Sequence, residues 1–152
     1  MTIRLNAMPN AYSLNAPIPN LLRKRAQPRI APVEAIREHI NLLLSTRLNE
    51  YRYDPAMGCG IWAEDYANIT NPTQWKSDAE QTITNLIVQY EKRLQYARVY
   101  VDIDEPADQD ADGRIIRVRR RITIRVTGNL PETGETMPEQ TFVMYFSPVA
   151  SE

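Results

Sequence analysis

Four carboxylic acids are the candidates for acid–base chemistry in the helical half of this chain. Cleavage of a glycosidic bond needs two carboxyl groups on opposite sides of a sugar, one of them with a raised pKa. The candidates are Glu38, Glu64, Asp65 and Glu91, and nothing in their spacing pairs two of them across a cleft. The sequence therefore predicts that the protein is not an enzyme. A cell-wall glycosidase is the alternative, and muralytic activity lost on Glu38→Gln or Glu64→Gln would support it.

Metal-ion and nucleophile chemistry have equally few candidate residues. His39 is the only histidine and Cys59 the only cysteine, and no second His or Cys lies near either at a metal-ligand spacing. We expect His39 to be a packing or surface residue and Cys59 to be buried. The segment Asp108–Gly113 resembles the start of a calcium loop, but position twelve is Arg119 instead of the required Glu, so an acidic hairpin turn is predicted. No metal and no cofactor are expected.

A row of arginines is the one feature that suggests nucleic acid. Arg117, Arg119, Arg121 and Arg125 fall on one face of a predicted strand. No aromatic residues interleave with them, and the acidic residues of the preceding strand offer cross-strand partners. The net charge of −1 and the pI near 5.9 add no general attraction to phosphate. We predict no nucleic-acid binding; salt-dependent DNA binding lost on combined Arg119→Ala and Arg121→Ala substitution would contradict this.

Length and composition predict a single soluble domain of 152 residues, charged at 24 % of positions. The single cysteine is typical of a reducing compartment, so a cytoplasmic location is expected. No apolar run of 18 residues and no signal-peptide pattern is present, so no direct membrane insertion is predicted.

The first segment, residues 1–31, is rich in proline and asparagine and has neither helical nor strand periodicity. Its second half is basic, with Arg23, Lys24 and Arg25 in succession. Two interpretations remain open, a solvated tail and an arm that becomes ordered against a partner.

Residues 32–152 form the predicted domain. Apolar residues at three- and four-residue steps predict helices over about 32–48 and about 72–95, and alternation predicts strands over Val99–Ile103, Ile115–Val126 and Gln140–Phe146, with a break near Arg120. The predicted fold class is α+β, with two long helices packed on a small antiparallel sheet and an extended N-terminal arm. The last strand is expected at the sheet edge, where it could pair with another chain.

The junction between the second helix and the first strand has the sequence Tyr90–Leu94. Within it Glu91 and Arg93 do not face each other as an i, i+4 pair of a helix would. We therefore expect both charges to be available to separate partners.

Taken together, four segments resemble the gene-25-like baseplate family, called TssE in type VI secretion systems and also found in contractile phage tails and extracellular injection particles. The segments that carry the resemblance are Ile36–Arg47, Pro55–Gly60, Tyr90–Leu94 and Val99–Ile103, within about residues 32–148. The resemblance implies a structural baseplate component of a contractile injection system. Some relatives carry a lysozyme label.

The resemblance also implies partners and contact residues. A Glu-Pro-Arg triplet of the family docks on the helical core bundle of the baseplate wedge; Glu91 and Arg93 match it, and Lys92 replaces the proline. The implied partners are wedge proteins similar to TssF and TssG and the tail-sheath subunits, within a large symmetric complex. The family's sheet resembles the strand-exchange region of the sheath, which implies that an edge strand seeds sheath assembly. Its candidate contacts are Gln140, Phe142, Met144 and Phe146.

Overall fold

The computed structural model describes residues 11–14, 29–63, 71–104, 107–109, 115–118 and 120–146. Two helices form its first layer. Helix α2 spans Pro32–Ser45 and helix α3 spans Pro72–Tyr90, each with proline in its first turn, where the missing N–H leaves no helical bond unmade. The side chain of Asn71 accepts a hydrogen bond from the Gln74 N–H and caps α3. Both helices begin where the sequence predicts, and both end a few residues earlier than predicted.

The second layer is an antiparallel sheet of three strands, β3 (Gln95–Asp104), β6 (Arg120–Asn129) and β7 (Thr136–Phe146), in the order β3-β6-β7. The last strand therefore lies at an edge, as predicted. The predicted break near Arg120 is confirmed, because the preceding strand β5 (Ile115–Val118) leaves this sheet and pairs with β4 (Ala107–Gln109) instead. The turn between β4 and β5 lies outside the described residues.

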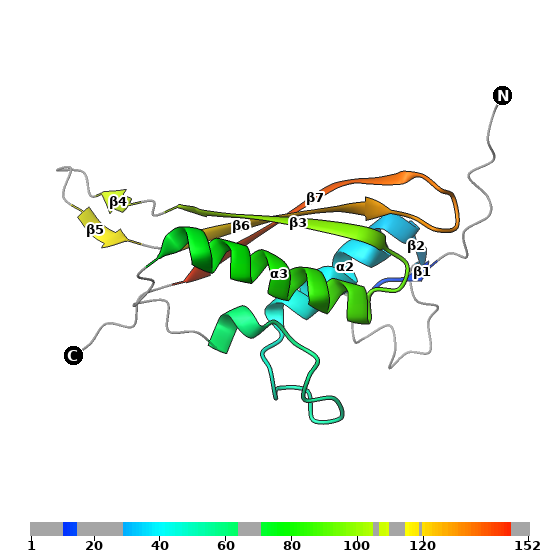
Figure 1. Ribbon diagram of the computed structural model, residues 1–152, viewed down its shortest axis with the longest axis horizontal. Helices are drawn as coiled ribbons and strands as arrows, with labels where there is room; N and C mark the ends of the chain where they lie inside the picture. The colour runs from blue at the N-terminus through cyan, green and yellow to red at the C-terminus, as the bar shows by residue number, and fades with distance from the viewer. Residues whose placement is uncertain are drawn as a thin grey trace.

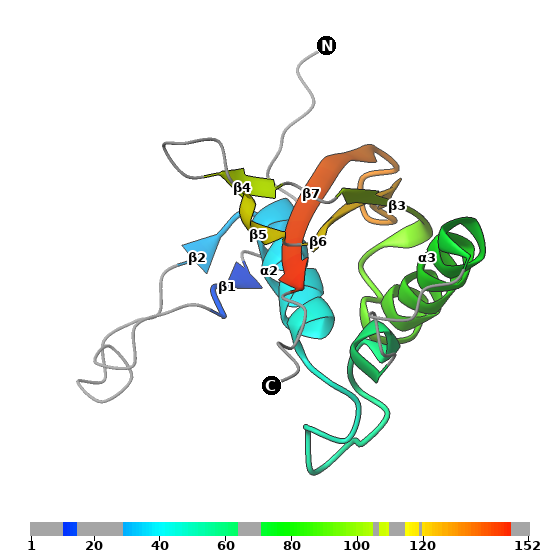
Figure 2. The same ribbon diagram turned by 90° about the vertical axis from the view of Figure 1, so that its left-hand side faces the viewer.

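Both helices cover the same face of the sheet, as Figures 1 and 2 show. The alternate residues of each strand that point toward the helices are buried, and the opposite face of the sheet carries none of the core. The core joins the helix stripes to these strand residues and includes Ile36, Ile40, Leu43, Ile83, Ile87, Val101, Ile124, Val126 and Phe142. Burial of this apolar area fixes the register of the strands, since shifting a strand by one residue would turn its buried side chains to the outer face of the sheet. The structure thus supports the predicted α+β class.

Two short strands are described in the N-terminal segment, for which the sequence predicts an extended arm. Strand β1 (Ala11–Tyr12) pairs with β2 (Arg29–Ile30), which leads into α2. Next to β1, the hydroxyl of Ser13 and the N–H of Leu14 donate hydrogen bonds to the Glu38 carboxylate on α2. The basic residues Arg23, Lys24 and Arg25 lie outside the described residues.

A loop of residues 46–59 follows α2 and leads to the 3-10 helix η1 (Gly60–Ala63). It projects from the domain at the lower edge of Figure 1. Neither helix of the described part of the chain is long and apolar enough to cross a membrane.

Candidate docking site

Helix α3 ends in a tight turn that brings its last charged residues together. The Glu91 N–H donates to the Ile87 carbonyl at 2.8 Å, and the chain then turns so that the Leu94 N–H reaches the Glu91 carbonyl. Lys92, the residue after Glu91, donates a hydrogen bond from its Nζ to the Val88 carbonyl at 2.9 Å. A lysine in this position satisfies one of the free carbonyls at the helix end and carries a favourable charge for the helix dipole.

Glu91 and Arg93 form a bidentate ion pair, which corrects the expectation that they would be available to separate partners. Arg93 Nε lies 2.8 Å from Glu91 Oε1, and Arg93 Nη2 lies 2.6 Å from Oε2. The Arg93 backbone N–H donates to Oε1 as well, at 3.0 Å. The expectation was wrong because it placed both residues on a continuing helix, whereas α3 ends at Tyr90.

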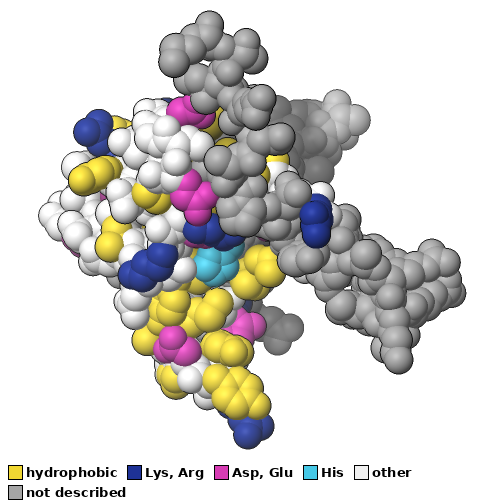
Figure 3. All heavy atoms as spheres, turned by 90° about the vertical axis from the view of Figure 1, so that its right-hand side faces the viewer, with side chains coloured by type: hydrophobic (Ala, Val, Ile, Leu, Met, Phe, Trp, Pro, Cys, Tyr) yellow, Lys and Arg dark blue, Asp and Glu magenta, His cyan; other side chains and the backbone are white. Residues whose placement is uncertain are grey.

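His39 on α2 completes this cluster from the other helix. Its Nδ1 lies 2.8 Å from Glu91 Oε2, so the sole histidine of the chain packs against the carboxylate. No sequence pattern indicates this contact, because 52 residues separate the two positions. His39 is partly exposed, as expected for a packing or surface residue, and lies beside a basic side chain in Figure 3.

The Glu91 carboxylate is buried and still ionised. Its residue is only 1 % exposed, the one charged residue in the described core. Burial alone would raise its pKa, but the hydrogen bonds from Arg93 and His39 outweigh that effect and lower the pKa to about 2. A carboxyl that is ionised at neutral pH cannot act as the general acid of a glycosidase.

Arg93 is the most exposed member of the cluster. Its side chain is 45 % exposed, although its Nη2 also lies 3.5 Å from the Ala35 carbonyl. Glu91 therefore holds the guanidinium in one orientation at the molecular surface. The remaining N–H groups of such a fixed guanidinium can donate to a partner with little loss of conformational entropy.

The predicted contacts on β7 occupy alternate positions of the strand, on the face of the sheet that covers the core. Phe142 is buried in the core and Met144 packs against it, while the Gln140 amide donates to the Pro138 carbonyl. The side chain of Phe146 lies outside what the structure describes. Phe142 and Met144 therefore offer a partner only their backbone, and the exposed large hydrophobic side chains of this strand are Val143 and Tyr145.

Two arginines of β6, Arg121 and Arg125, are paired with acids of the neighbouring strand, as the sequence predicts. Arg121 Nη2 lies 2.6 Å from Asp104, and Arg125 Nη2 lies 2.7 Å from Asp102, which Lys76 of α3 also contacts. These pairs place a carboxylate beside both described arginines of the row, on the outer face of the sheet. The side chains of Arg117 and Arg119 lie outside the description.

The other residues considered for catalysis or metal binding form no reactive site among the described residues. Glu38 accepts hydrogen bonds from Ser13 and Leu14, and Glu64 and Asp65 lie outside the described residues. Cys59 is buried, as predicted, and burial raises the pKa of its thiol to about 11. Among the described residues, no three His, Cys, Asp or Glu side chains are grouped so that they could hold a metal ion.

Comparison with known proteins identifies the family. Residues 31–130 match the family described as baseplate wedge protein gp25, so the chain belongs to the gp25 baseplate wedge family. No curated protein matches the sequence.

The solved structures that resemble the chain include the following two. A proposed tail lysozyme from Geobacter sulfurreducens is 20 % identical and aligns over 84 % of this chain and 100 % of its own, with a TM-score of 0.54. A chain of the baseplate complex from the type VI secretion system is 13 % identical over 76 % of this chain and 92 % of its own, with a TM-score of 0.48. The Geobacter structure supports the fold, and its lysozyme name belongs to that protein.

Proposed function

We propose that this protein links the core bundle of a baseplate wedge to the tail sheath of a contractile injection machine, and that it acts there as a structural component without catalytic activity. The observation that carries this proposal is the oriented Arg93 at the end of α3, in a chain of the wedge family. The family resemblance implies that the triplet containing Glu91 and Arg93 docks on a helical bundle. Wedge proteins similar to TssF and TssG are the proposed partners.

In this proposal Glu91 and Arg93 have different tasks. Both oxygens of Glu91 are engaged within the chain, so this residue positions the guanidinium instead of contacting the partner. Arg93 makes the contact, and a carbonyl or carboxylate at the end of a bundle helix suits its planar donors. Lys92 stands beside it in the same turn, with its Nζ on Val88.

The opposite part of the proposal concerns the sheath. The outer edge of β7 has no neighbouring strand in the described sheet, and an exposed edge can accept a strand from another chain. We propose that Gln140–Phe146 engages a sheath strand through its backbone. The basic residues Arg23, Lys24 and Arg25 are proposed to bind neighbouring baseplate subunits.

The test of the wedge contact is the affinity of Arg93→Ala for the purified wedge proteins encoded beside this chain. We expect Arg93→Ala to weaken binding by at least about tenfold, because an arginine in a fixed orientation is a typical interface hot spot. Arg93→Lys should bind nearly as poorly, since lysine cannot form the bidentate pair with Glu91. Biolayer interferometry with immobilised wedge complex measures both values.

Arg125→Ala is the matched control, because Arg125 is also a half-exposed, ion-paired arginine but lies on the outer face of the sheet. Its affinity for the wedge proteins should equal that of the wild type, and circular dichroism should show all three variants folded. Equal binding by folded Arg93→Ala and wild type would reject the wedge contact at this site.

The cell-wall glycosidase remains the alternative, and no described pair of carboxyls favours it. Among its candidate acids, Glu91 is ionised at neutral pH, and Glu38 is hydrogen-bonded by the N-terminal segment. Release of muropeptides from purified cell wall by the wild type, abolished in Glu38→Gln, would establish that activity instead.

A further inference from the structure

The loop of residues 46–59 is a second feature at the surface that the wedge contact does not use. Backbone hydrogen bonds close it on itself, from the Asn49 N–H to the Pro55 carbonyl at 2.9 Å and from the Cys59 N–H to the Thr46 carbonyl at 2.8 Å. Its shape is thus fixed by internal contacts, as in the compact surface loops that are often functional.

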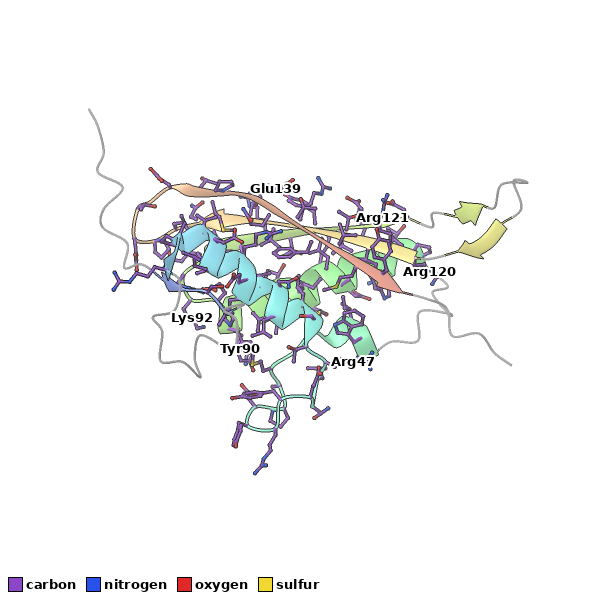
Figure 4. The ribbon with its side chains drawn as sticks, turned by 180° about the vertical axis from the view of Figure 1, so that it is seen from behind. Arg47, Tyr90, Lys92, Arg120, Arg121 and Glu139 are labelled. Atoms are coloured by element: carbon purple, nitrogen blue, oxygen red, sulfur yellow. The ribbon has the colours of Figure 1, made fainter. Side chains whose placement is uncertain are left out.

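Side chains attach the loop firmly to the domain. At its base, Arg47 lies over the ring of Trp62, whose indole N–H donates to the Leu44 carbonyl at 2.6 Å. Near its tip, Asp54 accepts a hydrogen bond from the Tyr90 hydroxyl at the end of α3, at 2.9 Å. Figure 4 shows Arg47 and Tyr90 where the loop meets the two helices.

The tip of the loop exposes two aromatic rings and an arginine. Tyr53 is 78 % exposed and Tyr51 is 45 % exposed, and their rings meet edge to face with centroids 5.7 Å apart. The guanidinium of Arg52 lies 5.3 Å from the centre of the Tyr53 ring and has no ion-pair partner among the described residues. Tyrosine and arginine are the residues that contribute most at protein interfaces, and here they are stacked before any partner binds.

This tip is continuous with the Arg93 site. Tyr90, which holds Asp54, immediately precedes Glu91 in the chain. Leu42 is 42 % exposed and lies three residues after His39, on the same side of α2. Figure 3 shows apolar side chains running from the histidine down to the end of the molecule, where a basic side chain closes the run.

Two cations along this surface lack an acidic partner among the described residues, whereas its two carboxylates, Glu50 and Asp54, accept hydrogen bonds from neighbouring groups of the chain. Asp54 is engaged by Tyr90, and Glu50 accepts a hydrogen bond from the Arg47 N–H. Arg52 at the loop tip and Lys92 at the helix end are cations without a described acidic partner. Apolar contacts flanked by cations are complementary to an amphipathic helix that carries acidic residues beside its apolar stripe.

We propose that the tyrosine loop, defined as Tyr51–Tyr53, is a second docking element that binds an acidic amphipathic helix of the same wedge partner. This inference rests on the proposed function and extends its contact surface from Arg93 to the loop tip. The two contacts together form one continuous interface, with Arg93 fixing orientation and the tyrosines providing apolar area.

The test compares the affinities of Tyr53→Ala and Tyr145→Ala for the purified wedge complex. Both are exposed tyrosines, but Tyr145 is 56 % exposed on the outer face of the sheet. We expect Tyr53→Ala to weaken binding by at least about tenfold and Tyr145→Ala to leave it unchanged. Arg52→Ala should weaken binding a few-fold and make the affinity less dependent on salt.

The possible outcomes separate this inference from the proposed function. Unchanged binding by Tyr53→Ala, together with weakened binding by Arg93→Ala, would overturn the tyrosine loop and leave the wedge contact standing. A wild type that does not bind the wedge complex would overturn both. Binding to phosphatidylcholine–phosphatidylglycerol vesicles that depends on Tyr53, with unchanged wedge affinity, would also overturn the inference and assign the loop to a lipid surface.

Discussion

At the scale of single residues, the Glu91 carboxylate is the one charged group that lies buried in the described core. It is removed from water, yet it receives three hydrogen bonds from Arg93 and one from His39. Removing the partner of a buried charge leaves that charge uncompensated, and the resulting loss of stability exceeds the net stabilisation that the intact pair provides. The cluster therefore links α2 to the end of α3 and also sets the direction of Arg93.

The low pKa of Glu91 predicts how stability depends on pH. Because the folded pKa of about 2 lies below the ordinary value of 4.5, the carboxylate stabilises the fold fully above pH 4.5, and this contribution is lost as the pH falls toward 2. At about 1.4 kcal/mol per pH unit, Glu91→Gln should lower the free energy of unfolding by about 3 kcal/mol at pH 7. The difference from wild type should be about half as large at pH 3, measured by urea unfolding.

Glu139→Gln provides the control for this measurement. Glu139 is exposed on β7, so its replacement should leave the free energy of unfolding unchanged at both pH values. A difference between Glu91→Gln and wild type that stays constant from pH 7 to pH 3 would show that the carboxylate is not the group that titrates.

The sequence indicates Glu91 and Arg93 as candidate contact residues, but their pairing with each other could not be predicted from it. Two positions along a helix correspond to a rotation of about 200°, so the side chains of residues two apart point to nearly opposite sides. A helix that continued to about residue 95, as predicted, would therefore keep the Glu91 and Arg93 side chains apart. The actual helix ends at Tyr90, and the turn that follows reverses this relation. The burial of Glu91 and its contact with His39 depend on how α2 and α3 pack, which no local pattern specifies.

At the scale of elements, the loop of residues 46–59 depends on the backbone of Gly58. Gly58 has φ +150°, and a Cβ atom there would lie 2.6 Å from the backbone carbon and oxygen of Arg47. Backbone atoms cannot move aside as a flexible side chain can. Glycine thus allows the close approach of the two ends of the loop.

Gly58→Ala should lower the free energy of unfolding by about 2 kcal/mol or more, because the new methyl group forces the loop ends apart. Gly134→Ala is the matched comparison, since Gly134 also has a positive φ, +70°, but nothing lies within 4 Å of its added Cβ. It should cost only about 1 kcal/mol. Thermal unfolding followed by circular dichroism measures both, and equal losses would contradict the close-approach argument.

Most helices and strands could be predicted, because the apolar residues that they bury recur in the sequence at helical or strand spacing. Three- and four-residue apolar steps gave α2 and α3, and alternation gave β3, β6 and β7. The pairing of β1 with β2 was not predictable, because two-residue strands have no periodicity. The tyrosine loop has none either, and its exposed rings could be recognised only once its hydrogen bonds were known.

At the scale of the whole molecule, the two proposed contacts lie at opposite ends of the sheet. The strand register places Gln95, Asn129 and Thr136 together beside the end of α3, and Asp104, Arg121 and Tyr145 together at the far end. With about 3.3 Å per residue, the ends of these ten-residue strands are about 30 Å apart. Figure 4 shows Lys92 and Arg121 at these two ends.

This separation predicts that sheath seeding and wedge binding can be abolished independently. Tyr145→Lys places a charge on the exposed side of the edge strand, where lysine opposes the addition of another strand. Because sites this far apart behave additively, the variant should bind the wedge complex with wild-type affinity and fail to start sheath polymerisation on assembled baseplates. Electron microscopy counts the baseplates that carry sheath. Tyr53→Lys should show the reverse defect, with weak wedge binding. If Tyr145→Lys baseplates carry sheath as often as wild type, then strand addition at β7 does not join this protein to the sheath, and its role ends at the wedge.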